Sequence, residues 1–353
     1  MTVAWLHRTP RAAVAWGGGL VLFGLLLLLA NSITQFQDFQ LSEVAAYVVT
    51  VAGLSMLTGL SGQVSLGHGA LMMVGAYVTA LLMLHTGLPL LAVLVGATIG
   101  GAVAGLVLGV VAARLRGPYL AGATLAFAVA LPEIPKAHAN LGGDQGLTIN
   151  PLLPPSWMGP NATPERWTAY ICLAAAVVAL VLVANLDRSR FGRNFRAVRD
   201  DEIAASLAGI PVARTQILAF VVSAACAGLG GGLLALVIQT IGPDGFTLAL
   251  SIQLLVAMVI GGMGSLFGAV IGAVLLVYLP GWATDLATGM GLSEQNGANM
   301  ALLLFGAVLI VVILVLPGGV VGGLRRLGAS ARRWYANRSA GTHPRVETTP
   351  GAT

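Results

Sequence analysis

A short polar cluster lies inside an otherwise apolar stretch of the sequence. Residues 62–69 read GQVSLGHG, and no charged residue occurs between positions 44 and 113. Hydrogen-bonding groups are costly inside an apolar span unless another helix or a water-filled path satisfies them. Gln63, Ser65 and His68 therefore either join neighbouring helices or contact a polar solute, and the residues leave both readings open.

A second group of polar residues forms the longest charged stretch within the body of the chain. Residues 187–214 hold six arginines. Within this stretch, residues 199–210 predict a short helix, because the acidic residues 200–202 suit the positive end of a helix dipole and Gly209, followed by a proline, ends it. Such a helix is either a solvated loop helix or a rigid element on which another protein docks.

Several kinds of catalytic site are absent from the sequence. A P-loop needs a lysine that reaches the phosphates, and the only lysine, Lys136, lies in no such motif. The HExxH and GxSxG patterns are missing as well. Cys172 and Cys226 lie in apolar segments and build neither a disulfide framework nor a metal site. We therefore expect no enzyme activity, no metal and no cofactor in this chain.

The composition places these residues on membrane-spanning helices. Of the 353 residues, 57% are hydrophobic and only 9% are charged, and the mean hydropathy is +0.89. A soluble domain carries about a quarter charged residues, so lipid is the only solvent that can cover helices this apolar. Glycines at four-residue intervals over residues 96–109 and 264–272 predict closely packed helices.

Length and charge predict ten spans. A span needs about 20 apolar residues, and we expect a retained first span at residues 12–30. The uncharged region at 44–113 is long enough for three crossings, with breaks near 59–62 and 85–87, although such glycine-rich breaks also fit re-entrant turns. The later spans are expected near residues 119–135, 167–186, 214–244, 248–282 (two spans that turn near 264–265) and 298–316.

Basic residues set the orientation, because cytoplasmic loops collect Lys and Arg. With both termini in the cytoplasm, 16 of the 18 basic residues lie inside, and only Lys136 and Arg166 lie outside. The expected fold is thus an all-α polytopic membrane protein with about ten transmembrane helices, N-in and C-in. Residues 1–323 form the membrane domain, and the basic tail, residues 324–353, is expected to be disordered and near anionic lipid.

Five sequence blocks occur in the order typical of one family. They are residues 59–70 (GLSGQVSLGHGA), 116–127 (RGPYLAGATLAF), 142–147 (GGDQGL), 188–210 (RSRFGR, then DEIAA and GI) and 250–268 (LSI, then GGMGSLFG). Each block resembles a signature of the branched-chain amino-acid ABC permeases of the LivM type. The second and third blocks favour LivM over its paired LivH-type subunit.

The resemblance implies a type II-like ABC importer permease in the inner membrane of a bacterium, carrying branched-chain or other hydrophobic amino acids. Its partners would be ABC ATPase subunits, which bind the ATP, a LivH-like second permease and an extracytoplasmic substrate-binding protein; no nucleic-acid partner is expected. The ATPase-coupling residues would be Arg199, Asp200, Asp201, Glu202, Ala205 and Gly209. The candidate translocation path holds Gln63, Ser65 and His68.

Two positions depart from the family pattern, and two other functions remain open. The family commonly has an acidic residue where Pro118 stands and often a glutamate near Val129, so no substrate or gating role is assigned there. A urea or short-amide importer permease has a very similar sequence pattern. An ATP-independent channel or facilitator is a further alternative, although it requires no ATPase-docking loop.

Overall fold

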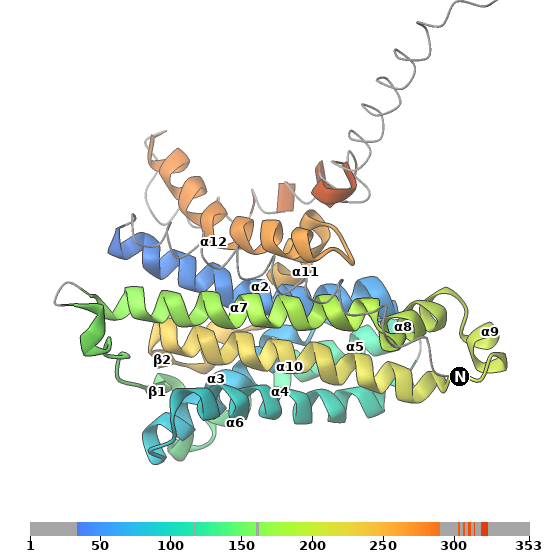
Figure 1. The fold of residues 1–353 in the computed structure, drawn as a ribbon, viewed down its shortest axis with the longest axis horizontal. Coiled ribbons are helices and arrows are strands. Elements are labelled where there is room, and N and C mark those ends of the chain that lie inside the picture. Colours follow the sequence, from blue (N-terminus) through green and yellow to red (C-terminus); the bar gives the residue numbers. More distant parts are fainter. Residues whose placement is uncertain are drawn as a thin grey trace, which may run out of the picture.

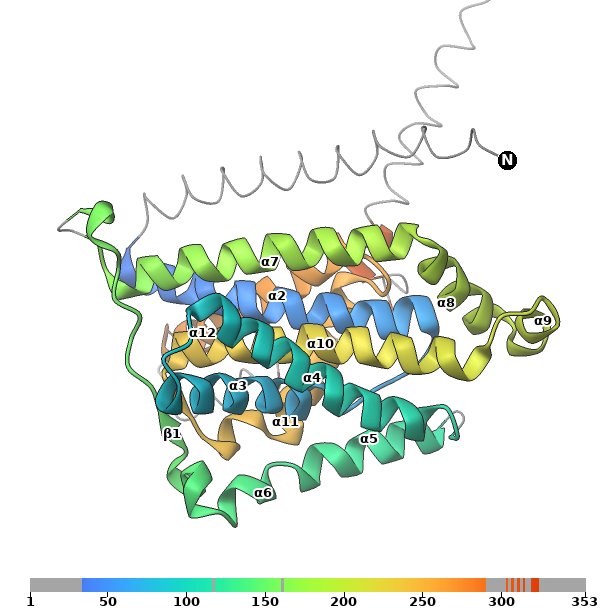
Figure 2. The same cartoon turned by 60° about the horizontal axis from the view of Figure 1, so that its bottom comes forward.

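The structure is a bundle of long helices that run along one common axis (Figures 1 and 2). This computed structural model describes residues 34–115, 118–159 and 162–289, together with positions 303, 306, 307, 310, 311, 314 and 319–323. Its α-helices are α2 (Gln35–Ser61), α3 (His68–His85), α4 (Leu90–Ala112), α5 (Pro118–Ala130), α6 (Glu133–Lys136), α7 (Pro164–Arg188), α8 (Arg190–Asp200), α9 (Glu202–Leu207), α10 (Val212–Ile238), α11 (Leu248–Gly261) and α12 (Leu266–Gly289).

The apolar helices support several membrane crossings. Within the described ranges, seven helical segments are long and apolar enough to span a membrane, or eight if the bent pair Tyr119–Lys136 and Ala139–Gln145 is one span. The three segments expected between residues 44 and 113 are α2, α3 and α4, with breaks at 62–67 and 86–89. The expected first span and most of the last lie outside the described residues. The total of ten and the orientation therefore stay predictions.

Two helices form the centre of the bundle, and the others surround them. α2 packs against α3, α7, α10, α11 and α12, and α10 packs against α2, α3 and α4. Every residue from position 44 to position 57 of α2 is buried, as expected for a helix that is apolar all round. α4 instead exposes Leu91, Ile99 and Val103, and we expect these side chains to face lipid or another membrane subunit.

Glycines allow α4 and α10 to touch through their backbones. A Cβ atom added to Gly101 would overlap the carbonyl oxygen of Ala224 and would lie 2.7 Å from the Cα of Gly228. One added to Gly105 would overlap the methyl group of Ala224. The glycine spacing of α4 thus serves close helix packing, as predicted.

The chain leaves helical geometry between α2 and α3. Gly62 has a left-handed backbone (φ 73°) that ends α2, and such a conformation favours glycine because it has no Cβ. Residues 62–67 are not helical, and Figure 2 shows this connector running back along the bundle before α3 begins. We call residues 62–67 the unwound segment.

The end of the bundle opposite α9 carries the predicted outer loop. There β1 (Leu147–Thr148) pairs antiparallel with β2 (Thr240–Ile241), a short ribbon that the sequence did not predict within the all-α fold. Lys136 lies 3.3 Å from both Glu133 and Asp244, which joins α6 to the 3-10 helix Pro243–Phe246.

Candidate functional site

The charged loop contains two helices where one was expected. The short helix predicted within residues 199–210 is α9, but it starts later than predicted, because α8 ends at Asp200 and α9 begins after an extended Asp201. Asp201 Oδ1 accepts hydrogen bonds from the backbone N–H groups of Ile203 (2.8 Å) and Ala204 (3.0 Å). A carboxylate that satisfies these donors starts a new helix and does not continue the old one.

The end of α9 follows the prediction. Gly209 has φ 80°, the left-handed conformation that closes many helices. The N–H of Ile210 donates to the carbonyl of Ala205 and the N–H of Gly209 donates to that of Ser206, both at 3.0 Å. Caps at both ends make this six-residue helix a well-defined body.

The two faces of α9 differ in chemistry. Ile203 and Leu207 are 73% and 84% exposed, while Ala205 is buried on the inner face. Glu202 also points inward, because its Oε1 accepts a 2.8 Å hydrogen bond from Gln216 Nε2 on α10. α9 projects beyond the end of the bundle in both views (Figures 1 and 2), so the exposed pair sits at its tip.

Arg199 fastens the end of α8 to the end of α2. Its Nη1 donates to the carbonyl of Gly59 at 2.7 Å, and its Nε and Nη2 donate to Asp200 Oδ1 at 2.9 and 2.7 Å. Its aliphatic stem covers Gly62, where an added Cβ would lie 2.7 Å from Arg199 Cγ. Asp200 therefore orients Arg199 and is not part of the start of α9.

The other end of α8 is fastened to α7. Arg196 pairs with the carboxylate of Asp187 and donates a second bond, 3.1 Å long, to its carbonyl. Ser189 caps α8 by accepting from the N–H of Phe191 at 3.1 Å. Both ends of the charged loop's first helix are thus anchored on membrane-spanning helices.

His68 and Ser65 belong to a fully buried network. His68 Nε2 lies 2.7 Å from Ser223 Oγ on α10, and His68 Nδ1 lies 3.1 Å from Ser65 Oγ. Ser223 donates its single hydroxyl hydrogen to the carbonyl of Gly53, 2.8 Å away. It must then accept from Nε2–H, and Nδ1 accepts from Ser65. These contacts favour the interhelical reading for both residues.

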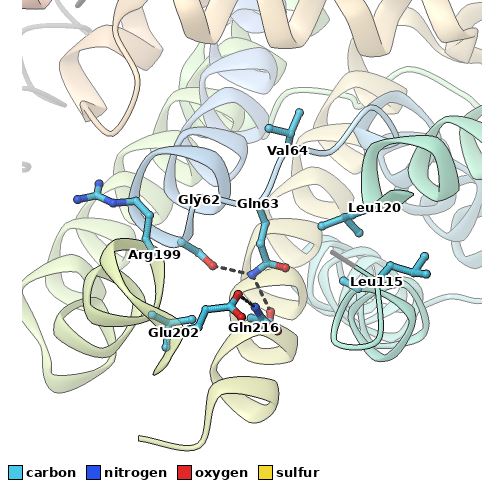
Figure 3. A pocket seen from close by; sticks show the side chains of 11 residues that line it. Gly62, Gln63, Val64, Leu115, Leu120, Arg199, Glu202 and Gln216 are labelled. Carbon is cyan, nitrogen blue, oxygen red and sulfur yellow. Dashed lines mark hydrogen bonds between the residues drawn. The ribbon is translucent and has the colours of Figure 1, made fainter. Parts of the chain in front are cut away.

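Gln63 differs from its two neighbours. Its Nε2 donates to Ser61 Oγ (2.6 Å) and to the carbonyl of Gln216 (3.4 Å), whereas its buried Oε1 has no hydrogen-bond partner among the described residues. Gln63 lines a cavity of about 430 Å³ together with Leu115, Leu120 and Glu202. Figure 3 shows its amide between Glu202 and Gln216 on one side and the two leucines on the other.

Sequence reasoning missed the partners of the polar cluster. Thr124 accepts from the N–H of Leu66 at 3.0 Å, and Ser251 accepts from the N–H of Gly69 at 3.0 Å. Each partner is a single hydroxyl in an apolar helix. A lone hydroxyl in an apolar helix could have indicated such a partner, since these groups in membrane helices usually bond to another helix. Sequence could not indicate which helix.

The described residues include no group of three or more His, Cys, Asp or Glu side chains placed to hold a metal ion. Cys172 and Cys226 are buried and unpaired. Val129, where the family often has a glutamate, is exposed on α5, so it lies apart from the buried cluster.

These features define a class: a multi-pass helical membrane protein with an anchored, doubly capped loop at one end. Residues 38–313 match the family model described as "Branched-chain amino acid transport system / permease component". The chain belongs to this family, which comprises transport permease components and not enzymes.

Three curated relatives illustrate the similarity. The LivM permease of Salmonella typhimurium is 33% identical over 255 residues, and that of Escherichia coli 32%; both alignments cover 65% of this chain. The chain spans 60% of the length of these two relatives. The Escherichia coli LivH permease is 30% identical over 295 residues, 79% of this chain and 92% of LivH.

Proposed function

We propose that the chain is the membrane-spanning permease subunit of an ATP-driven ABC importer in the inner membrane of a bacterium. The observation that carries this proposal is α9, which holds two exposed aliphatic side chains at the tip of a capped, anchored loop. Residues 187–214 would form the coupling loop, on which a separate ATPase subunit docks. The chain itself would bind no ATP.

The outer face of α9 would dock on the ATPase, and its inner face would hold the helix against the bundle. Ile203 and Leu207 are four residues apart and so lie on one face, where they would enter an apolar groove of the ATPase. Of the residues named from the sequence, Glu202 and Ala205 face inward and would orient this face without touching the partner. A rigid, anchored helix can carry a rigid-body movement into the spans, which a flexible loop cannot.

Leu207→Asp tests the docking. We expect the variant to reach the membrane at the wild-type level and to lose at least tenfold in the ATPase subunit that copurifies with it, because a carboxylate would be buried in an apolar groove. Leu153→Asp is the matched control, since Leu153 is 80% exposed in the loop that follows β1, far along the chain from α9. Normal copurification of the Leu207 variant, or uptake that needs no ATPase, would overturn the proposal.

The remaining partners complete the path. A LivH-like second permease would enclose the solute together with this chain, and an extracytoplasmic binding protein would deliver the solute to the loop around β1 and β2. The names of the relatives support branched-chain or other hydrophobic amino acids as the solute. In such a system the binding protein largely sets selectivity.

The solute is tested on that binding protein. We expect leucine, isoleucine or valine to raise its melting temperature by several degrees, because a ligand that binds only the folded state stabilises it. Urea and short amides serve as the comparison. A shift with urea and none with the amino acids would replace the proposed solute and leave the importer assignment in place.

A further inference from the structure

The coupling loop is bound to the end of α2 at two separate points. The first is the hydrogen bond from Arg199 to the carbonyl of Gly59. The second runs through Gln216 on α10, whose side chain donates to Glu202 on α9 and whose backbone carbonyl accepts from Gln63 in the unwound segment. Figure 3 shows the members of this second connection side by side. Both contacts end at the point where α2 stops.

We propose that Arg199 and Gln216 are positioning residues that transmit movement of the coupling loop to the unwound segment, residues 62–67. This inference rests on the proposed importer function. Without other contacts, α9 could transmit a movement of the ATPase only to α8 and α10, the helices that precede and follow it in the chain. Arg199 and Gln216 add a connection to a third, non-helical element.

The unwound segment is built to move at its first half. The N–H groups of Gly62 and Gln63 bond back to the last turn of α2, and the cavity of about 430 Å³ lies directly beside Gly62, Gln63 and Val64. Protein interiors contain few spaces of this size, so the segment has room to shift without a clash. Val64 is 43% exposed although it is apolar, which fits a residue beside open space.

The second half of the segment is fixed. The N–H of Leu66 bonds to Thr124, Ser65 bonds to His68, and the following N–H of Gly69 bonds to Ser251. Movement applied at Gln63 would therefore bend the segment and would not slide it. The Oε1 of Gln63, which has no partner in the described part of the chain, is available for a new hydrogen bond in the shifted position.

Gln216→Leu and Arg199→Met test the connection. Each replaces a donor by an apolar side chain of similar length, and Met keeps the stem that covers Gly62. In proteoliposomes that contain the whole importer, we expect the solute carried per ATP to fall at least fivefold in both variants, while the Gln216 variant hydrolyses ATP within twofold of the wild-type rate. A merely structural role would lower ATP hydrolysis and solute uptake in parallel and leave the solute carried per ATP unchanged, because less folded complex would remain.

Thr215→Val is the matched control. Thr215 precedes Gln216, is buried, and bonds only within its own turn, to the carbonyl of Pro211 at 2.9 Å, so its ratio of solute to ATP should be that of wild type. An unchanged ratio in both test variants, or a parallel loss of both activities, overturns the inference while the importer function stands. Absence of ATP-driven uptake in the wild-type complex overturns the proposed function itself.

Discussion

His68 Nε2 and Ser223 Oγ lie 2.7 Å apart and join the first turn of α3 to the middle of α10. Ser223 passes the connection on to the carbonyl of Gly53 on α2, so one imidazole holds three helices together at the core of the bundle. Both side chains are fully buried. A polar group in this position stabilises the fold only while each of its bonds is made.

His68→Ala should therefore destabilise the protein. The change leaves the hydroxyl of Ser65 and that of Ser223 each short of a partner and creates a cavity, at a cost of about 2–3 kcal/mol. Thermal unfolding in detergent micelles measures the effect, and His85→Ala is the control because His85 is exposed and bonds only to the carbonyl of Leu81 in its own helix. Equal melting temperatures for the two variants would contradict the structural role.

Gln63→Ala should affect transport more than folding. The Gln63 side chain donates two hydrogen bonds, and its Oε1 has no partner among the described residues, so the loss of stability should be at most about 1 kcal/mol. We expect a change of at least threefold in the apparent affinity or rate of uptake at a normal membrane level. A variant with wild-type kinetics would remove Gln63 from the transport machinery.

Gly101→Val should disrupt the contact between α4 and α10. Its side chain would enter space occupied by the backbone of Ala224 and Gly228, and overpacking of this kind costs about 3 kcal/mol or more when backbone must move. Gly122→Val is the matched control, since a Cβ added there meets no described atom within 4 Å apart from its own stretch of helix backbone. The Gly101 variant should have a lower membrane level and a lower melting temperature than wild type. The Gly122 variant should be unchanged in both.

The ion pair between Asp38 and Arg166 gives a prediction about charge. Asp38 is fully buried, and its Oδ2 lies 3.3 Å from Arg166 Nε. Arg166→Met leaves a buried carboxylate without this cation and should cost about 3 kcal/mol. Adding Asp38→Asn removes the charge and should restore most of the loss. A double variant no more stable than Arg166→Met alone would show that the pair is not what holds α2 to α7.

Ion pairs also hold the two basic residues that the expected orientation places on the outer side. The orientation predicted from the Lys and Arg residues places Lys136 and Arg166 on the outer side, whereas the other 16 basic residues lie inside. In the structure each lies against carboxylates, Arg166 against Asp38 and Lys136 against Glu133 and Asp244. These two cations are placed by tertiary contacts, which a count of loop charges does not include.

The sequence by itself determined the membrane class, the breaks around α3 and the end of α9. The length of an apolar run and the positions of glycine and proline act on the local backbone, so their effects can be predicted from the neighbouring sequence. It misplaced the start of α9, because Asp201 could continue one helix or cap the next, and only the anchoring of α8 through Arg199 and Arg196 decides between them.

Tertiary structure alone decided what the polar cluster of residues 62–69 does. Gln63, Ser65 and His68 have the same apolar setting in the sequence, yet His68 finds Ser223, which is 155 positions away, and Gln63 borders a cavity. Whether a buried polar side chain is satisfied depends on which helix packs against it, and helices far apart in sequence meet only in the folded bundle. The residues supplied the chemistry, and the packing separated structural groups from those left available for function.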